Sequence, residues 1–154
     1  MKNFMDRIKQ FAADAIEAGG IPIPVTADML LMLFRAGTKQ EKANEIHNLD
    51  VTFREDTVSI SGFTRKMLME IQFELQLKPV KAKDRTLYFE VVKMKPLNQN
   101  WIKNLVLNHP PVTVYEHGLL EVDLNHFETI RKIKVGNIQG FEVREQKIWI
   151  TVGR

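Results

Sequence analysis

The sequence contains no cysteine, only two serines and no apolar run long enough to cross a membrane. Without cysteine, disulfide frameworks and thiolate metal or redox sites are excluded. The serines, Ser59 and Ser61, lie among alternating apolar residues, and Ser61-Gly62 lacks the glycine that precedes the serine of a nucleophile elbow. The longest apolar run, residues 29–34, is far shorter than the roughly 18 residues that indicate a membrane-spanning helix.

Motifs for nucleotide, metal and acid–base chemistry are also missing. The chain has neither G-x-G-x-x-G nor G-x-x-x-x-G-K-[ST], and its aspartates form no local pair for general acid–base catalysis. His109, His117 and His126 lack the close helical spacing of a zinc site, which favours surface or capping roles. We therefore expect a protein that is not an enzyme and that holds no metal or cofactor.

The N-terminus bears on where the protein resides. Asp6, Arg7 and Lys9 interrupt the apolar residues there, so no stretch has the length of a signal-peptide core. This predicts a soluble cytoplasmic protein, although an exported protein whose leader has been removed would look the same.

The sequence does contain enough apolar material for one core. Its 154 residues are 44% hydrophobic and 27% charged, which suits a single domain of ordinary size. We expect an N-terminal helix and an extended segment in residues 1–24, followed by a helix and an antiparallel sheet in residues 25–154. The fold class is therefore predicted to be α+β.

Apolar residues at helical spacing, together with capping signals, predict the helices. Thr26 is expected to cap the second helix, Gly37 to end it and Asn125 to cap the last. The predicted helices cover residues 3–18, 26–37, 38–46 (a more polar piece), 97–108 and 125–133.

The strongest strand signal is the strict alternation of residues 67–78, where every second residue is apolar. Pro79 and residues 81–84 are expected to turn the chain, and Pro22 with Pro24 forces residues 21–24 to be extended. Short turns predict antiparallel pairing of further strands, over residues 49–53, 58–62, 87–91, 112–114, 120–124, 140–144 and 147–152.

The length of the predicted strand 67–78 raises the question of what covers its apolar face. At about 3.3 Å per residue it spans about 40 Å, whereas a helix over residues 3–18 spans about 24 Å at about 1.5 Å per residue. Several helices in series could cover the face, or the sheet could curl on itself, meet a second copy, or hold an apolar guest. Met29, Met32, Met67 and Met69 favour a guest, because methionine adapts to irregular space.

Positive charge is concentrated in one stretch of the chain. The net charge is +3, but residues 64–103 carry nine basic and four acidic side chains. Such a stretch is typical of a solvated sheet face, and it also suits an anionic membrane surface or nucleic acid. Nucleic acid is the less favoured partner, because no recognised motif accompanies the charge.

The order of elements resembles a known group. A helix from Thr26 is followed by Leu49–Phe53, Val58–Gly62, the long strand ending in Leu77-Lys78-Pro79, and Leu87–Val91. This order is similar to the small bacterial members of the tubular lipid-binding (TULIP-like) superfamily, of the LmeA-like and YpmS-like kind, over residues 25–95 and more loosely over 96–152. The resemblance implies a long curved antiparallel sheet wrapped around a helix, an apolar groove that takes lipid, and no catalytic residues.

Together these observations predict non-catalytic binding of a lipid or other apolar ligand in a groove between the sheet and the helix over residues 29–34. The alternatives are a dimeric interaction or scaffold protein without a ligand and a nucleic-acid-binding module that uses residues 65–103. The predicted groove lining is Met29, Leu33, Phe34, Ile71, Phe73, Leu75, Phe89 and Val91. An anionic head group or membrane surface is expected to meet Lys78, Lys81, Lys83 and Arg85.

Overall fold

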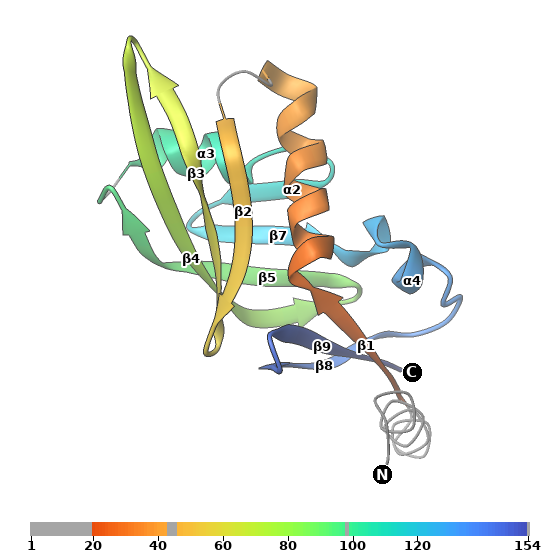
Figure 1. Ribbon diagram of the computed structural model, residues 1–154. Coiled ribbons are helices and arrows are strands. Elements are labelled where there is room, and N and C mark those ends of the chain that lie inside the picture. The colour runs from red at the N-terminus through yellow and green to blue at the C-terminus, as the bar shows by residue number, and fades with distance from the viewer. Residues whose placement is uncertain (1–19, 43–45, 98, 154) are drawn as a thin grey trace.

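The structure, a computed structural model, describes residues 20–42, 46–97 and 99–153, so the predicted helix over residues 3–18 lies outside the described part. The described residues form an α+β fold with two antiparallel sheets, as Figure 1 shows. The predicted fold class is therefore confirmed. The single sheet wrapped around a helix is replaced by a six-stranded and a three-stranded sheet.

The larger sheet holds most of the predicted strands in the order β2-β3-β4-β5-β7-β6. In Figure 1, β2, β3 and β4 run alongside helix α2 (Ala27–Lys42), whereas β5 and β7 run across that direction, so the sheet is strongly twisted. The strands are β2 (Ile46–Arg54), β3 (Thr57–Lys66), β4 (Met69–Lys83), β5 (Thr86–Lys95), β6 (Thr113–Glu116) and β7 (Leu119–Asp123).

The smaller sheet has the order β1-β9-β8, from β1 (Gly20–Thr26), β9 (Lys147–Gly153) and β8 (Asn137–Arg144). The extended segment predicted from Pro22 and Pro24 is thus a paired strand, with Ile23 opposite Ile150. Since side chains and N–H groups alternate along a strand, both prolines share one side, and an edge strand such as β1 tolerates proline on its open side. This pairing takes β1 and the C-terminal hairpin away from the larger sheet.

Helix α2 (Ala27–Lys42) begins as predicted, because the Met29 N–H donates to Thr26 Oγ1 over 3.2 Å. The prediction that Gly37 ends the helix is wrong, since α2 continues through it. A Cβ at Gly37 would lie 3.0 Å from the Cβ of His109. The glycine therefore permits close approach of the 109 region.

Strand β4 differs at both ends from the prediction for residues 67–78. It begins at Met69 and runs through Pro79 to Lys83, and the chain turns at Asp84-Arg85 instead of residues 81–84. Pro79 fits inside the strand because the register with β5 shifts between Pro79 and Lys81, and a bulge relaxes the hydrogen-bonding demand.

The remaining helices are shorter than predicted. Helix α3 covers Asn100–Leu107, and the expected helix over residues 125–133 consists of a 3-10 turn, η1 (Leu124–His126), and a four-residue helix, α4 (Glu128–Arg131). Asp123, rather than Asn125, caps η1, because its carboxylate accepts the Asn125 N–H over 3.0 Å. None of the helices in the described ranges has the length and apolar character that a membrane span needs.

One buried cluster joins both sheets. Ile23 and Val25 of β1 and Ile148 of β9 belong to the same core as Phe73 and Leu75 of β4. The sheets also meet where the Ile138 N–H donates to the backbone carbonyl oxygen of Asp84 over 2.7 Å. The β4–β5 hairpin thus anchors the chain that leads from α4 into β8.

Candidate functional site

A cavity of about 470 Å³ lies between helix α2 and the segment that carries η1 and α4. Met29, Met32, Leu33 and Ala36 form one wall, because residues three and four apart on a helix share a face. The remaining lining comes from Val112, His126, Phe127, Glu128, Thr129 and Arg131.

The interior of the cavity is apolar and its rim carries charge of both signs. Phe127 is only 8% exposed and contributes its ring from the core side. Met32 is 70% exposed, so an apolar side chain stands in solvent at the mouth. The exposed rim residues His126, Glu128 and Arg131 offer polar partners. A volume of this size lies within the range of small-molecule sites, roughly 300–1,000 Å³.

Arg85 holds the wall opposite α2 in place. Its Nε donates to the Gly136 oxygen over 2.9 Å and its Nη2 to the Ile133 oxygen over 2.6 Å. Its Nη1 donates to the Ile130 oxygen over 3.0 Å and to Asn125 Oδ1 over 3.2 Å. A planar guanidinium suits such convergent acceptors. A cation near the last turn of a helix also interacts favourably with the negative end of the helix dipole. The predicted head-group residue Arg85 thus supports the 125–136 segment.

The three predicted head-group lysines lie on β4 and do not line the cavity. Lys78 Nζ is 3.3 Å from an Asp56 carboxylate oxygen, and Lys81 Nζ is 4.7 Å from the centre of the Tyr88 ring. Lys83 is exposed. Nothing in this arrangement brings these cations to the cavity mouth.

The structure brings only two of the eight predicted lining residues, Met29 and Leu33, to the cavity. Ile71 and Val91 are partly buried against the core. The others lie inside the core with at most 2% exposure, namely Phe34, Phe73, Leu75 and Phe89.

Sequence reasoning missed most of the cavity. Ala36 could have been found, because it lies seven residues after Met29 on the same helical stripe. Val112 and Phe127 carry no comparable local signal, since their position depends on how distant segments pack.

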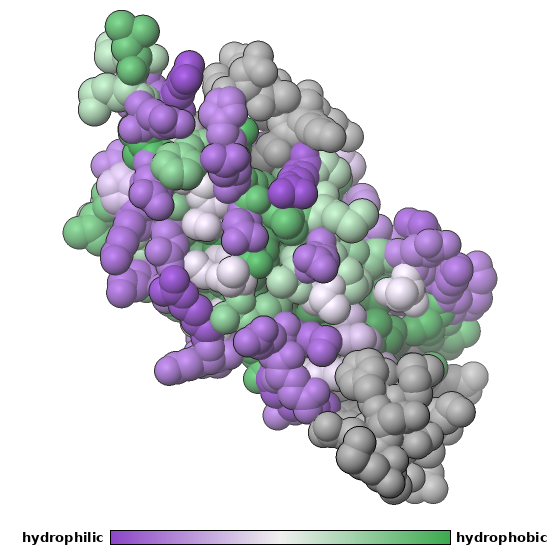
Figure 2. Space-filling model, viewed as in Figure 1, coloured by the Kyte–Doolittle hydropathy of each residue, from purple (hydrophilic) through white to green (hydrophobic). Residues whose placement is uncertain are grey.

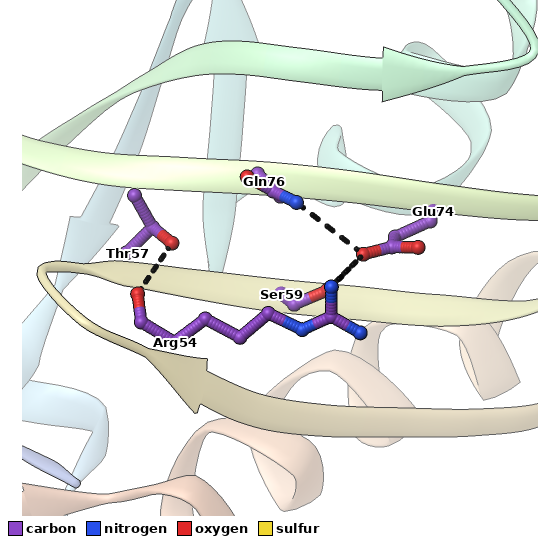
Figure 3. A network of polar contacts seen from close by, with 5 residues as sticks. All are labelled: Arg54, Thr57, Ser59, Glu74 and Gln76. Carbon is purple, nitrogen blue, oxygen red and sulfur yellow. Dashed lines mark hydrogen bonds and ion pairs between the residues drawn. The ribbon is translucent and has the colours of Figure 1, made fainter.

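A polar network on β2, β3 and β4 accounts for one of the two serines (Figure 3). The Ser59 hydroxyl donates to Glu74 Oε1 over 3.0 Å, and Gln76 Nε2 donates to the same oxygen over 3.4 Å. Arg54 Nη1 lies 3.5 Å from this oxygen. The Ser59 hydrogen bond, with help from Gln76 and Arg54, lowers the pKa of Glu74 against a smaller opposing effect of burial. A carboxylate so stabilised is a weakened base, and the network ties three strands together.

The histidines do not converge. His109 is 4% exposed, His126 lies at the cavity and the His117 ring is 3.3 Å from a Glu116 oxygen. In the ranges that the structure describes, no three side chains of His, Asp or Glu gather as metal ligands.

Comparison with known proteins identifies no related protein. No protein-family model matches the sequence, and neither curated proteins nor solved structures give a significant match. The geometry of the cavity therefore carries the functional argument.

Proposed function

We propose that the chain is a non-catalytic binding module that holds a lipid-like or other apolar ligand in the cavity between α2 and residues 126–131. The single observation that carries the proposal is the cavity of about 470 Å³ with its mostly apolar lining. An apolar guest would remove Met32 and its neighbours from water, which is favourable at roughly 25 cal/mol per Å² of apolar surface.

The arrangement favours an amphipathic ligand with a single long apolar part. Met29, Met32 and Leu33 offer unbranched or flexible side chains that adapt to an acyl chain. Arg131 and His126 at the rim can donate hydrogen bonds to a carboxylate or phosphate end. A groove beside a helix is also what the TULIP-like resemblance implies, with residues 126–131 forming the second wall in this chain.

Native mass spectrometry of protein purified from cells, followed by organic extraction, tests the proposal directly. We expect a mass increment that dissociates on activation and an apolar molecule in the extract. A ligand-free monomer in every preparation would count against the proposal, and a ligand-free dimer would favour a scaffold role instead.

A cavity-filling substitution tests the location of the site. Ala36 is exposed and lines the cavity, so Ala36→Trp places an indole there without disturbing the core. We expect the affinity for a dansyl-labelled fatty acid to fall at least about tenfold, which corresponds to about 1.4 kcal/mol.

Asn104→Trp is the matched control, because Asn104 is exposed on helix α3 and does not line the cavity. This variant should bind the probe within about twofold of the parent protein. Equal affinity of the parent and Ala36→Trp proteins for the probe, with both folded, would show that the ligand does not occupy this cavity.

A further inference from the structure

Three consecutive apolar side chains stand in solvent at the end of the β3–β4 hairpin. Met67 is 93%, Leu68 102% and Met69 69% exposed. None of them lines the cavity beside α2. Figure 2 shows apolar atoms at this end of the molecule, at the upper left, next to strongly hydrophilic ones. Apolar side chains exposed together in this way commonly mark an interaction site.

Met67 and Leu68 are not residue types that a two-residue hairpin turn favours. Met67 adopts a positive φ of 59°, a conformation that favours glycine, asparagine or aspartate in a two-residue hairpin. The other two-residue hairpin turns of the described chain all use polar residues or glycine, namely Glu55-Asp56, Asp84-Arg85, His117-Gly118 and Glu145-Gln146. Local backbone preference therefore does not explain Met67-Leu68, and a role for the side chains does.

The hairpin projects beyond its neighbours. Strand β4 pairs with β5 only from Glu74 onward, and β3 pairs with β2 only up to Thr64, which lies opposite Ile71, so residues 65–70 extend past both neighbouring strands. Three residues on each side of the hairpin, at about 3.3 Å each, reach about 10 Å. Figure 1 shows this hairpin end standing clear of the sheet at the upper left. A tip that extends this far can penetrate the interfacial layer of a bilayer, roughly 5–10 Å, without moving the rest of the molecule.

Basic residues outnumber acidic ones next to the tip. Arg65 and Lys66 are exposed immediately before it, and Glu70, opposite Arg65, is the one acidic residue within the hairpin end. Lys66 Nζ lies 4.9 Å from the centre of the Trp101 ring, so a tryptophan from α3 stands at the base of the tip. Apolar residues flanked by basic groups and tryptophan are typical of membrane interfaces.

We propose that Met67, Leu68 and Met69 insert into the surface of an anionic lipid bilayer while Arg65 and Lys66 contact its head groups. This assigns membrane contact to the hairpin end, in place of Lys78, Lys81 and Lys83. The inference goes beyond ligand binding in the cavity and stands or falls independently of it.

Co-sedimentation of the full chain with vesicles tests the inference. We expect binding to phosphatidylcholine vesicles that contain about one quarter phosphatidylserine, and much weaker binding to phosphatidylcholine alone, because basic groups favour anionic surfaces. The double variant Met67→Asn/Leu68→Gly places asparagine, which tolerates a positive φ, at position 67 and glycine, which is free to adopt either sign of φ, at position 68, so the hairpin should still fold. Its partitioning onto anionic vesicles should fall by roughly tenfold or more per buried side chain lost.

Two matched variants sharpen the result. His117→Asn creates the same Asn-Gly pair at another turn without changing formal charge, and it should bind vesicles like the parent protein. Arg65→Gln should lose roughly fivefold on anionic vesicles and little on neutral ones.

Equal vesicle binding by the parent and the double variant would overturn the inference, as would a parent protein that stays in the supernatant with anionic vesicles. A double variant that loses self-association in sedimentation velocity but keeps vesicle binding would assign the tip to a protein contact instead, and would also overturn it. Uptake of the dansyl fatty acid should be unchanged in the double variant, and Ala36→Trp should bind vesicles normally. The two proposals can therefore fail separately.

Discussion

Replacing Arg85 by methionine should destabilise the protein and loosen the cavity wall. The guanidinium donates four hydrogen bonds, three of them to the carbonyls of Ile130, Ile133 and Gly136. A hydrogen bond with a charged partner contributes about 1.5–3 kcal/mol when buried. Arg85 is partly buried and water can reach some of the freed carbonyls, so we expect a loss of about 3 kcal/mol rather than the full sum.

Urea denaturation measures this loss, and hydrogen exchange locates it. Amide hydrogen exchange should accelerate more in residues 126–138 than in β3 or β4. These residues include α4 and the start of β8. Arg85→Lys should lose about half as much stability, because an ammonium keeps the charge but cannot reach all the acceptors in one plane. Dansyl fatty acid binding should weaken as well, since the same segment lines the cavity.

Lys83→Met is the control for Arg85→Met. Lys83 is an exposed residue of the same hairpin, and its replacement should change the free energy of unfolding by at most about 0.5 kcal/mol. If Arg85→Met cost less than about 1 kcal/mol and left exchange in residues 126–138 unchanged, the supporting role of Arg85 would be refuted.

Two further predictions concern β4. Phe73 is 1% exposed, so Phe73→Ala should lower the free energy of unfolding, measured by urea denaturation, by about 3–5 kcal/mol. The folded fraction of this variant should keep the affinity of the parent protein for the dansyl fatty acid. Weaker probe binding with little loss of stability would instead place Phe73 in the ligand site. Because the pKa of Glu74 is lowered in the folded protein, its stabilising contribution is present above the unfolded value of about 4.3 and is lost as pH falls through the folded value. Glu74→Gln should therefore be less stable than the parent at neutral pH by about 0.5–1.5 kcal/mol, with the difference shrinking in denaturation series below about pH 4; a difference that stays constant with pH would contradict this.

The alternation of residues 67–78 predicts one apolar face that begins at Met67; the structure buries Phe73, Leu75 and Leu77 of that face but leaves Met67 and Met69 exposed, because they lie at the end of the hairpin. The sequence predicts that this face lines a ligand groove, whereas in the structure it packs into the core. The predicted lining residues Phe73, Leu75 and Phe89 lie in a core to which both sheets contribute. The length comparison between one strand and one helix could not reveal this, because it left out cover from the second sheet.

The cavity could be predicted only in part. Met29, Leu33 and Ala36 share a stripe that helical periodicity defines, so only the wall that α2 contributes is visible in the sequence. Phe127 joins them from about a hundred residues away, and its position depends on the hydrogen bonds of Arg85 to the Ile130 and Ile133 carbonyls. No local pattern encodes which carbonyls a side chain will reach.

The sequence by itself determined the class of the fold, the strand faces and the Thr26 cap, because each depends on residues a few positions apart. Only the tertiary structure decided that β1 pairs with β9, that α2 continues through Gly37 and that Arg85 donates to a backbone carbonyl some fifty residues away, that of Gly136. The physical reason is that these outcomes depend on contacts between segments distant in sequence. There the local preferences of proline, glycine and arginine permit several arrangements, and packing selects one.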